Sequence, residues 1–245
     1  SLLANGVSLL GPNAVVSVDD KVFWMARENF HAYTGKVETI PCTVLKYVFD
    51  DINLSQKYKF FAASNRMFNE VIWFYVSSAA NEIDRYAKFN YVEGTWDIGL
   101  LSRTAWIDYG IYDYPRATGA DDSVNYVYSH ELGTTADGVA MTSFIESADF
   151  DLDPAGEKFM FISKMIPDID IDTNSAATVD YILKTRDYPG DTLVTNSTSA
   201  ISSTTQQAFL RARARQAVIR VQSSAADVAW TLGDLRLNAR PDGER

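Results

Sequence analysis

The chain has 245 residues, of which 47% are hydrophobic and 13% aromatic, and its net charge is -10 with a pI near 4.7. This length is enough for a buried core and is typical of two domains, while the acidic charge argues against a protein that grips nucleic acid by neutralising phosphates. The single cysteine, Cys42, excludes an internal disulfide and a zinc site built of cysteines.

The first elements are two hairpins followed by a helix. Residues 1–13 are expected to be a loop or the end of a missing element. Because the sequence starts at Ser1 without a Met, we expect a fragment or a processed product. Residues 14–27 then form a hairpin around Asp19-Asp20, and residues 29–37 form the next. Apolar residues at helical spacing predict one short helix over 43–52, with Thr43 as its N-cap.

The stretch from Val71 to Trp106 predicts three consecutive antiparallel strands, over 71–76, 85–91 and from Trp96 onward. The same order of apolar strands and turns occurs in residues 22–39, at an offset of roughly 50 residues, which is in the range of β-propeller blades. We therefore expect propeller-like antiparallel meanders. A plain antiparallel meander would give the same local pattern.

The rest of the chain also indicates strands, so the predicted fold class is all-β. Strands at 124–130 and 139–152 are expected to complete a partial third meander, which gives a propeller-like domain over 1–150. Residues 151–245 are expected to form a β-sandwich-like domain. Its predicted strands are 158–166, 178–185, 206–222 and 229–237, and a polar loop is expected at 192–205.

Few residues indicate catalysis. The two histidines, His31 and His130, each lie within a strand pattern, where a lone histidine is more often structural. The sequence holds no nucleophile elbow, phosphate-binding glycine loop or dinucleotide fingerprint, and nothing in the spacing of the acids selects a pair for glycoside hydrolysis. We expect no enzyme activity and no cofactor.

Two acidic runs resemble calcium loops in part, because alternate oxygens can converge on a hard cation. Neither run has the glycine at the sixth position or the glutamate at the twelfth, and in a strand alternate acids line the wet face while their neighbours point inward. We favour this second interpretation. The acids concerned are Asp149, Asp151 and Asp153, and Asp168, Asp170, Asp172 and Asn174.

Two groups of side chains are candidates for an interface or a channel lining. Arg211, Arg213 and Arg215 are predicted to share one strand face, opposite Ala212 and Ala214, and such a ladder of like charges needs carboxylates of the same domain, an adjacent subunit, or phosphate. The acidic total favours carboxylates. The second group, Tyr109, Tyr112 and Tyr114, forms either a sugar-stacking platform, a subunit contact or, as we favour here, a packed corner.

Several ordered segments together resemble a known family. They are VFWMARENFHAYTGKVETIPCTVLKYVFDDIN, EVIWFYVSS, DRYAKFNYVEGTW, RTAWIDYGIYDYP, ARARQAVIRVQSS and VAWTLGDLRLNARPDGER. From about Lys21 onward the chain resembles the C-terminal part of the short-tail tube, nozzle and packaged-DNA stabilisation proteins of podoviruses. Members of that family are considerably longer than this chain, which puts a closed propeller in doubt.

The resemblance implies a virion protein of the tail without catalysis. It implies a ring of identical subunits, commonly a hexamer, that contacts the portal, the adaptor and other tail proteins, retains packaged DNA, and conducts it without sequence-specific binding. An acidic lining that repels phosphate suits such a conduit. We expect no membrane-spanning segment. The alternatives are a host-surface carbohydrate-binding β module and a glycan-cleaving enzyme.

Overall fold

The structure is a computed structural model that describes residues 7–121, 124–136, 138–153, 155–172 and 177–244. The chain divides into two compact units, Ser1–Leu132 and Gly133–Arg245. Strands dominate both, so the predicted all-β class is confirmed. Among the described residues, no helix has the length and apolar character that crossing a membrane requires.

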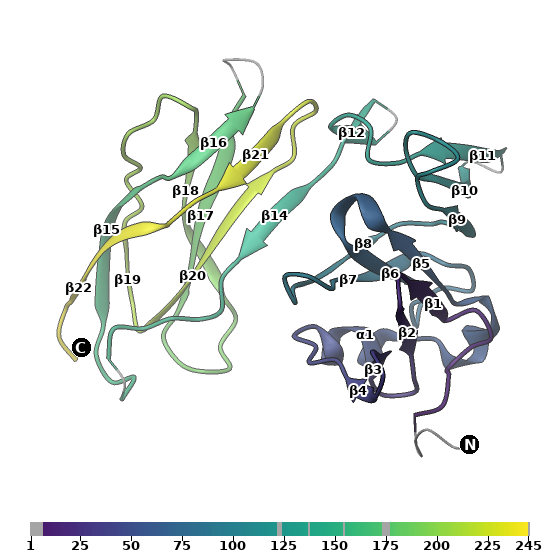
Figure 1. Ribbon diagram of the computed structural model, residues 1–245. Helices are drawn as coiled ribbons and strands as arrows, with labels where there is room; N and C mark the ends of the chain where they lie inside the picture. Colours follow the sequence, from purple (N-terminus) through teal and green to yellow (C-terminus); the bar gives the residue numbers. More distant parts are fainter. Residues whose placement is uncertain (1–6, 122–123, 137, 154, 173–176, 245) are drawn as a thin grey trace. The chain divides into compact units, whose positions relative to one another are not determined.

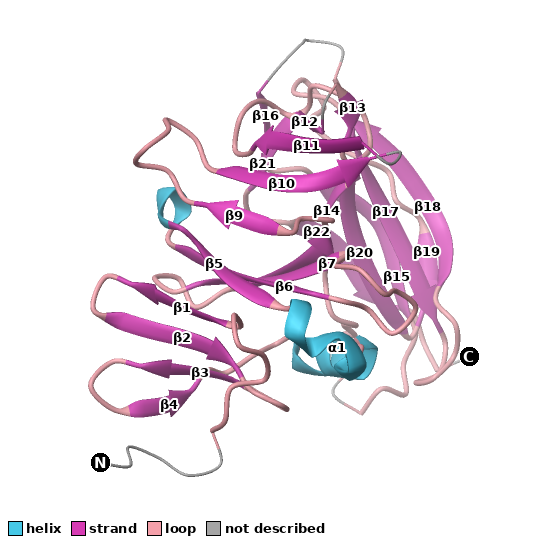
Figure 2. Ribbon diagram, turned by 90° about the vertical axis from the view of Figure 1, so that its right-hand side faces the viewer, coloured by secondary structure: helices cyan, strands magenta, loops and turns pink. Residues whose placement is uncertain are grey.

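The first sheet of unit 1 is a four-stranded antiparallel meander in chain order (Figure 2). Asp19, with φ of 51°, turns the first hairpin. Alternation along the strands buries Phe23 and Met25 against Phe30 and leaves Trp24 on the other face. The strands are β1 (Val15–Val18), β2 (Lys21–Met25), β3 (Phe30–Tyr33) and β4 (Val37–Thr39).

The second sheet repeats this arrangement. Its strands also follow chain order, and they confirm the predicted strands between Val71 and Trp106. The repeated sequence pattern has a structural counterpart, because β2 to β4 and β6 to β8 are the second to fourth strands of their sheets. The strands are β5 (Phe61–Asn65), β6 (Glu70–Tyr75), β7 (Arg85–Asn90) and β8 (Trp96–Leu100).

The third sheet has three strands, in the order β11-β10-β9. The first strands of the three sheets are neighbours: Asn13, just before β1, pairs in parallel with Phe61, and β5 lies beside β9. Adjacent blades of a propeller place their inner strands in this way. The bounds are β9 (Ala105–Ile107), β10 (Arg116–Asp121) and β11 (Val124–Ser129).

The predicted third meander is wrong in its last part. Residues 139–152 do not pair with β11: β13 (Val139–Ala140) pairs with β12 (Thr135–Ala136), and β14 (Ser143–Glu146) pairs with β20 of unit 2. The division between the units therefore falls after Leu132 and not at residue 150. Long-range strand pairing decides to which unit a strand belongs, and local sequence patterns do not reveal such pairing.

One α-helix lies between the first two sheets in the chain, as expected. It is α1 (Leu45–Asp51), which buries Val48, and it starts after Val44 without a side-chain cap, so the predicted Thr43 cap is wrong. Two short 3-10 helices were not anticipated, η1 (Leu54–Lys59) and η2 (Arg66–Phe68). The C-cap of η2, Asn69, takes the left-handed conformation with φ of 58°.

Aromatic rings hold the first two sheets together. The ring of Phe30 lies 4.7 Å from the rings of both Trp73 and Trp96, measured between centroids, and Phe89 lies 4.8 Å from Trp96. Phe30 and Trp73 are fully buried. Burying a large aromatic side chain contributes roughly 2–3 kcal/mol, so this cluster is the centre of the unit 1 core.

Unit 2 is built mainly of two antiparallel sheets, which Figure 1 shows in colours from teal (β14) through green to yellow. Their orders are β14-β20-β17-β18 and β19-β15-β22, and a separate pair is formed by β16 and β21. The bounds are β15 (Met160–Ile166), β16 (Ile169–Asp172), β17 (Val179–Arg186), β18 (Val194–Ile201), β19 (Ala212–Ala214), β20 (Gln216–Ser223), β21 (Ala229–Leu232) and β22 (Arg236–Pro241).

The two sheets share one core. Met160 and Ile162 of β15 are buried in the same cluster as Tyr181 and Leu183 of β17 and Ile219 of β20. Alternate residues of β17 are buried along its whole length. Two facing sheets with a common apolar interior constitute a sandwich.

Three local predictions in unit 2 are wrong. The polar stretch 192–205 contains β18, an edge strand on which Thr195 and Thr198 are exposed. Residues 206–222 do not form one strand, because β19 pairs with β15 whereas β20 pairs with β17. Residues 229–237 also divide, between β21 and β22. Both divided segments pass from one sheet to another, a change that composition does not mark.

Candidate functional site

The most distinctive surface feature of unit 1 is the loop between β9 and β10, which we call the tyrosine loop (residues 108–115). Its three tyrosines are 37%, 40% and 39% exposed for Tyr109, Tyr112 and Tyr114, and Ile111 is 80% exposed. The packed corner favoured from sequence is therefore wrong. Each of the three tyrosines keeps more than a third of its surface open to solvent.

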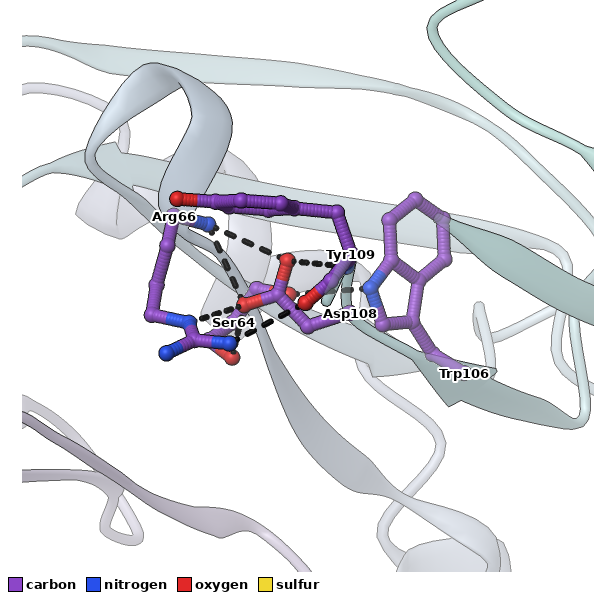
Figure 3. Close-up of polar contacts among 5 residues, drawn as sticks. All are labelled: Ser64, Arg66, Trp106, Asp108 and Tyr109. Atoms are coloured by element: carbon purple, nitrogen blue, oxygen red, sulfur yellow. Dashed lines mark hydrogen bonds and ion pairs between the residues drawn. The ribbon is translucent and has the colours of Figure 1, made fainter. Parts of the chain in front are cut away.

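Asp108 fixes the start of this loop (Figure 3). Its carboxylate accepts a hydrogen bond from Ser64 Oγ at 2.7 Å, from Arg66 Nε at 2.9 Å and from the backbone N–H of Tyr109 at 2.7 Å. The backbone N–H of Arg66 also donates to both of its oxygens. The side chain of Asp108 is only 11% exposed, and hydrogen bonds to a charged group contribute about 1.5–3 kcal/mol each.

Further contacts join the loop to the second sheet. Trp106 Nε1 donates to the backbone oxygen of Ser64 at 2.9 Å, and Arg66 Nη2 donates to the backbone oxygen of Tyr109 at 3.1 Å. The guanidinium carbon of Arg66 lies 5.3 Å from the centre of the Tyr109 ring. Asp108 raises the pKa of Arg66 through its hydrogen bond and its charge. The loop is thus anchored on η2 and β5.

The tip of the loop presents its rings in a defined arrangement. The backbone N–H of Gly110 donates to the backbone oxygen of Tyr112 at 3.0 Å, and Gly110 has a φ of 132°, which favours glycine. The guanidinium carbon of Arg116 lies 3.7 Å from the centre of the Tyr112 ring. An anchored, exposed set of phenols suits stacking and hydrogen bonding to a partner, since little entropy is lost on binding.

The second candidate group lies in unit 2, on the outer face of the sheet β19-β15-β22. Arg211 and Arg213 are exposed whereas Ala212 and Ala214 are buried, which is the predicted alternation. Arg213 forms an ion pair with Asp242 at 2.6 Å, and Arg215 Nε donates to the backbone oxygen of Glu157 at 3.1 Å. The predicted pairing with carboxylates of the same domain is therefore confirmed for Arg213. Arg211 and Arg215 form no ion pair with any residue that the structure describes.

Both histidines lie in structural contacts. His31 is 5% exposed, its ring centre lies 5.5 Å from that of Trp24, and its Nδ1 lies 3.2 Å from Thr39 Oγ1. His130 Nε2 accepts from Arg103 Nε at 2.9 Å. Burial, and then the charge of Arg103, lowers the pKa of His130 to about 4, while burial lowers that of His31. Both imidazoles are neutral at pH 7.

The acidic runs have separate outcomes. Asp149 pairs with Arg186, and Asp153 accepts from the backbone N–H groups of Glu157 and Lys158 at 3.2 Å. Residues 149–153 follow β14 and form no strand, so the strand interpretation is wrong there, whereas β16 shows it, with Asp170 and Asp172 exposed and Ile171 buried. Asn174 lies outside the described residues, among which no group of three or more His, Cys, Asp or Glu is suited to a metal ion.

A buried polar network was not anticipated. Asn65, with 0% exposure, donates from Nδ2 to Glu70 Oε2 at 3.0 Å and to Glu131 Oε1 at 2.9 Å. Lys88 pairs with Glu70 at 2.9 Å and with Asp97 at 3.4 Å. Burial raises the pKa of Glu131. Burial alone would lower the pKa of Lys88, but its interactions with Glu70 and Asp97 outweigh burial, so the pKa of Lys88 is raised.

The network joins residues far apart in the chain, so no local pattern marks it.

No family model matches this sequence, and the search of curated proteins finds no match. The candidate surfaces are thus an anchored aromatic loop in unit 1 and, as a separate feature, a basic sheet face in unit 2.

Proposed function

We propose that this chain is a structural component of a bacteriophage tail, in the tube or nozzle, which assembles into a ring of identical subunits, retains packaged DNA and forms the conduit for its ejection. Its place is the virion tail, where portal, adaptor and other tail proteins are its neighbours. The ordered segments that resemble short-tail tube proteins are the first support for this proposal.

The observation that carries the proposal is the open third sheet of unit 1. The first two sheets have four strands each, whereas the third ends at β11, an edge strand whose residues Val124, Tyr126 and Val127 are 49%, 47% and 67% exposed. Exposed apolar edges are usually covered in soluble proteins. A neighbouring subunit in a ring would cover such an edge.

The charge of the chain supports the conduit. A net charge of -10 repels DNA, so that DNA slides through a channel without being held by released counterions. The test is the mass and shape of the assembled chain by light scattering and negative-stain imaging. A ring with a central channel is the expected result, whereas a monomer at high concentration would contradict the proposal.

The tyrosine loop favours a second candidate, a carbohydrate-binding module for the host surface. Exposed, fixed tyrosine rings such as Tyr109 and Tyr112 suit stacking on sugar rings. A glycan screen with the unmodified chain, and with a variant carrying Tyr109→Ala and Tyr112→Ala, tests this function. Binding that the double variant loses would support it, and absence of binding to any glycan in the screen would reject it.

A further inference from the structure

We propose that the outer face of the sheet β19-β15-β22 binds the acidic strand β16 of a second copy of this chain. The contact is head-to-tail, because each copy contributes two different surfaces. This inference rests on the proposed assembly and names the surfaces that would join neighbouring subunits.

The basic surface, which we call the arginine face, is defined by Arg211, Arg213, Arg215, Arg240 and Phe161. Phe161 on the central strand lies opposite Arg213 on one side and Arg240 on the other. The guanidinium carbon of Arg240 lies 5.3 Å from the centre of the Phe161 ring. This row therefore runs across all three strands.

Aromatic rings also contact the guanidinium groups of Arg213 and Arg215. The guanidinium carbon of Arg213 lies 4.0 Å from the Phe159 ring centre, and that of Arg215 lies 4.6 Å from Phe159 and 4.8 Å from Tyr188. Stacking restrains a guanidinium while its N–H edge can still meet a carboxylate. The face is thus arranged in advance for an acidic partner.

The positive charge of this face is only partly neutralised. Asp242 pairs with Arg213, but Arg211, Arg215 and Arg240 form no ion pair with the residues that the structure describes. Arg211 and Arg240 are exposed. The whole chain is strongly acidic, so a second copy has an excess of carboxylates to offer.

The strand β16 carries a matching row of charge. Asp170 and Asp172 are exposed on one face, while Ile171 between them is buried. Their cross-strand neighbours on β21 are Thr231 and Ala229, which bear no charge. Within the described part of the chain, neither carboxylate forms a hydrogen bond or an ion pair.

The acidic row has the repeat of a strand. Alternate residues of a strand lie about 6.8 Å apart on one face, so Asp170 and Asp172 of β16 stand about that far apart. On the arginine face, Arg213 lies in β19 and Arg240 in β22, while Arg211 comes just before β19. The two carboxylates can therefore contact more than one guanidinium group of this face. Such charge complementarity sets orientation and partner choice at an interface.

A second copy accounts for more of these observations than nucleic acid does. DNA would explain the arginine face but would leave Asp170 and Asp172 without a partner. A second copy satisfies both rows, and contact between unlike surfaces generates a closed ring or an open filament. The inference therefore also predicts that neighbouring copies join head-to-tail.

Charge reversal in the full-length chain tests the contact. The first variant carries Arg211→Asp and Arg240→Asp, and the second carries Asp170→Arg and Asp172→Arg. Controls with the same change of charge use exposed residues of unit 1: Arg27→Asp with Lys46→Asp, and Asp20→Arg with Asp50→Arg. Sedimentation velocity over a range of protein concentration and salt measures self-association, and circular dichroism checks folding.

Each reversal variant is expected to weaken self-association about tenfold or more, whereas the controls stay near the unmodified chain. An equal mixture of the two variants, or all four changes in one chain, is expected to restore association. This restoration keeps the test valid, because a misfolded variant does not regain a partner.

Other outcomes would overturn the inference, each in a way that separates it from the proposed function. A ring that persists in both reversal variants overturns the inference alone. An open filament that the reversals abolish supports the contact and contradicts the tail ring. If the first variant loses binding of a short fluorescent DNA duplex but keeps its self-association, the arginine face is a DNA site and the inference is wrong.

Discussion

Arg66 Nε donates to Asp108 Oδ2 across 2.9 Å, and this ion pair joins η2, between β5 and β6, to the start of the tyrosine loop. The two residues are 42 positions apart. Because the side chain of Asp108 also accepts from Ser64 and from backbone N–H groups, the pair is one part of a wider anchor. This anchor determines how Tyr109 is presented.

Asp108→Ala is expected to destabilise unit 1 by about 1–3 kcal/mol, because several donors lose their acceptor. Thermal unfolding followed by circular dichroism measures this effect. Asp113→Ala is the matched control, since Asp113 is exposed in the same loop. Equal melting temperatures for Asp108→Ala and the unmodified chain would show that the anchor contributes nothing.

Asn65→Asp is expected to be more disruptive, by about 3 kcal/mol or more at pH 7. The change removes two donated hydrogen bonds and adds a buried negative charge beside Glu70 and Glu131. The penalty is expected to shrink as the pH falls and the acids take up protons. Denaturant unfolding from pH 7 to pH 4.5 tests this, with exposed Asn125→Asp as the control.

His130 is expected to make stability depend on pH between about 4 and 6.5. Its pKa is lowered to about 4 in the folded chain, so below pH 6.5 the unfolded chain binds a proton that the folded chain does not. Stability therefore falls as the pH drops through this window, by at most about 3 kcal/mol. His130→Gln, which keeps an acceptor for Arg103, is expected to flatten the dependence; an unchanged profile would contradict this account.

Trp73→Ala is expected to cost about 3–5 kcal/mol, because it opens a cavity in the aromatic cluster with Phe30 and Trp96. Urea unfolding measures the loss. Tyr58→Ala, at a position that is 60% exposed, is the control and is expected to change stability by less than about 0.5 kcal/mol. Similar values for both variants would mean that the cluster is not the centre of the core.

The sequence predicts unit 1 better than unit 2 for a physical reason. The continuous apolar run from Val71 to Tyr75 and the turn at Gly94, with φ of 73°, are local signals, and neighbouring strands of a meander pair in chain order. In unit 2, β14 pairs with β20, more than 70 residues later. Composition does not encode such pairing.

The candidate site was predicted only in part for the same reason. The alternation of Arg211, Arg213 and the alanines between them follows from strand geometry. The exposure of Tyr112 depends on how the loop leaves β9, and the link between Asn65 and Glu131 depends on tertiary contacts. Neither is visible in a local stretch of sequence.

The mass and shape of the assembled chain test the central claim most directly. Light scattering combined with negative-stain imaging is expected to find a ring of identical subunits around a central channel. A monodisperse monomer at high protein concentration would contradict the account and would shift attention to the tyrosine loop as a glycan-binding surface.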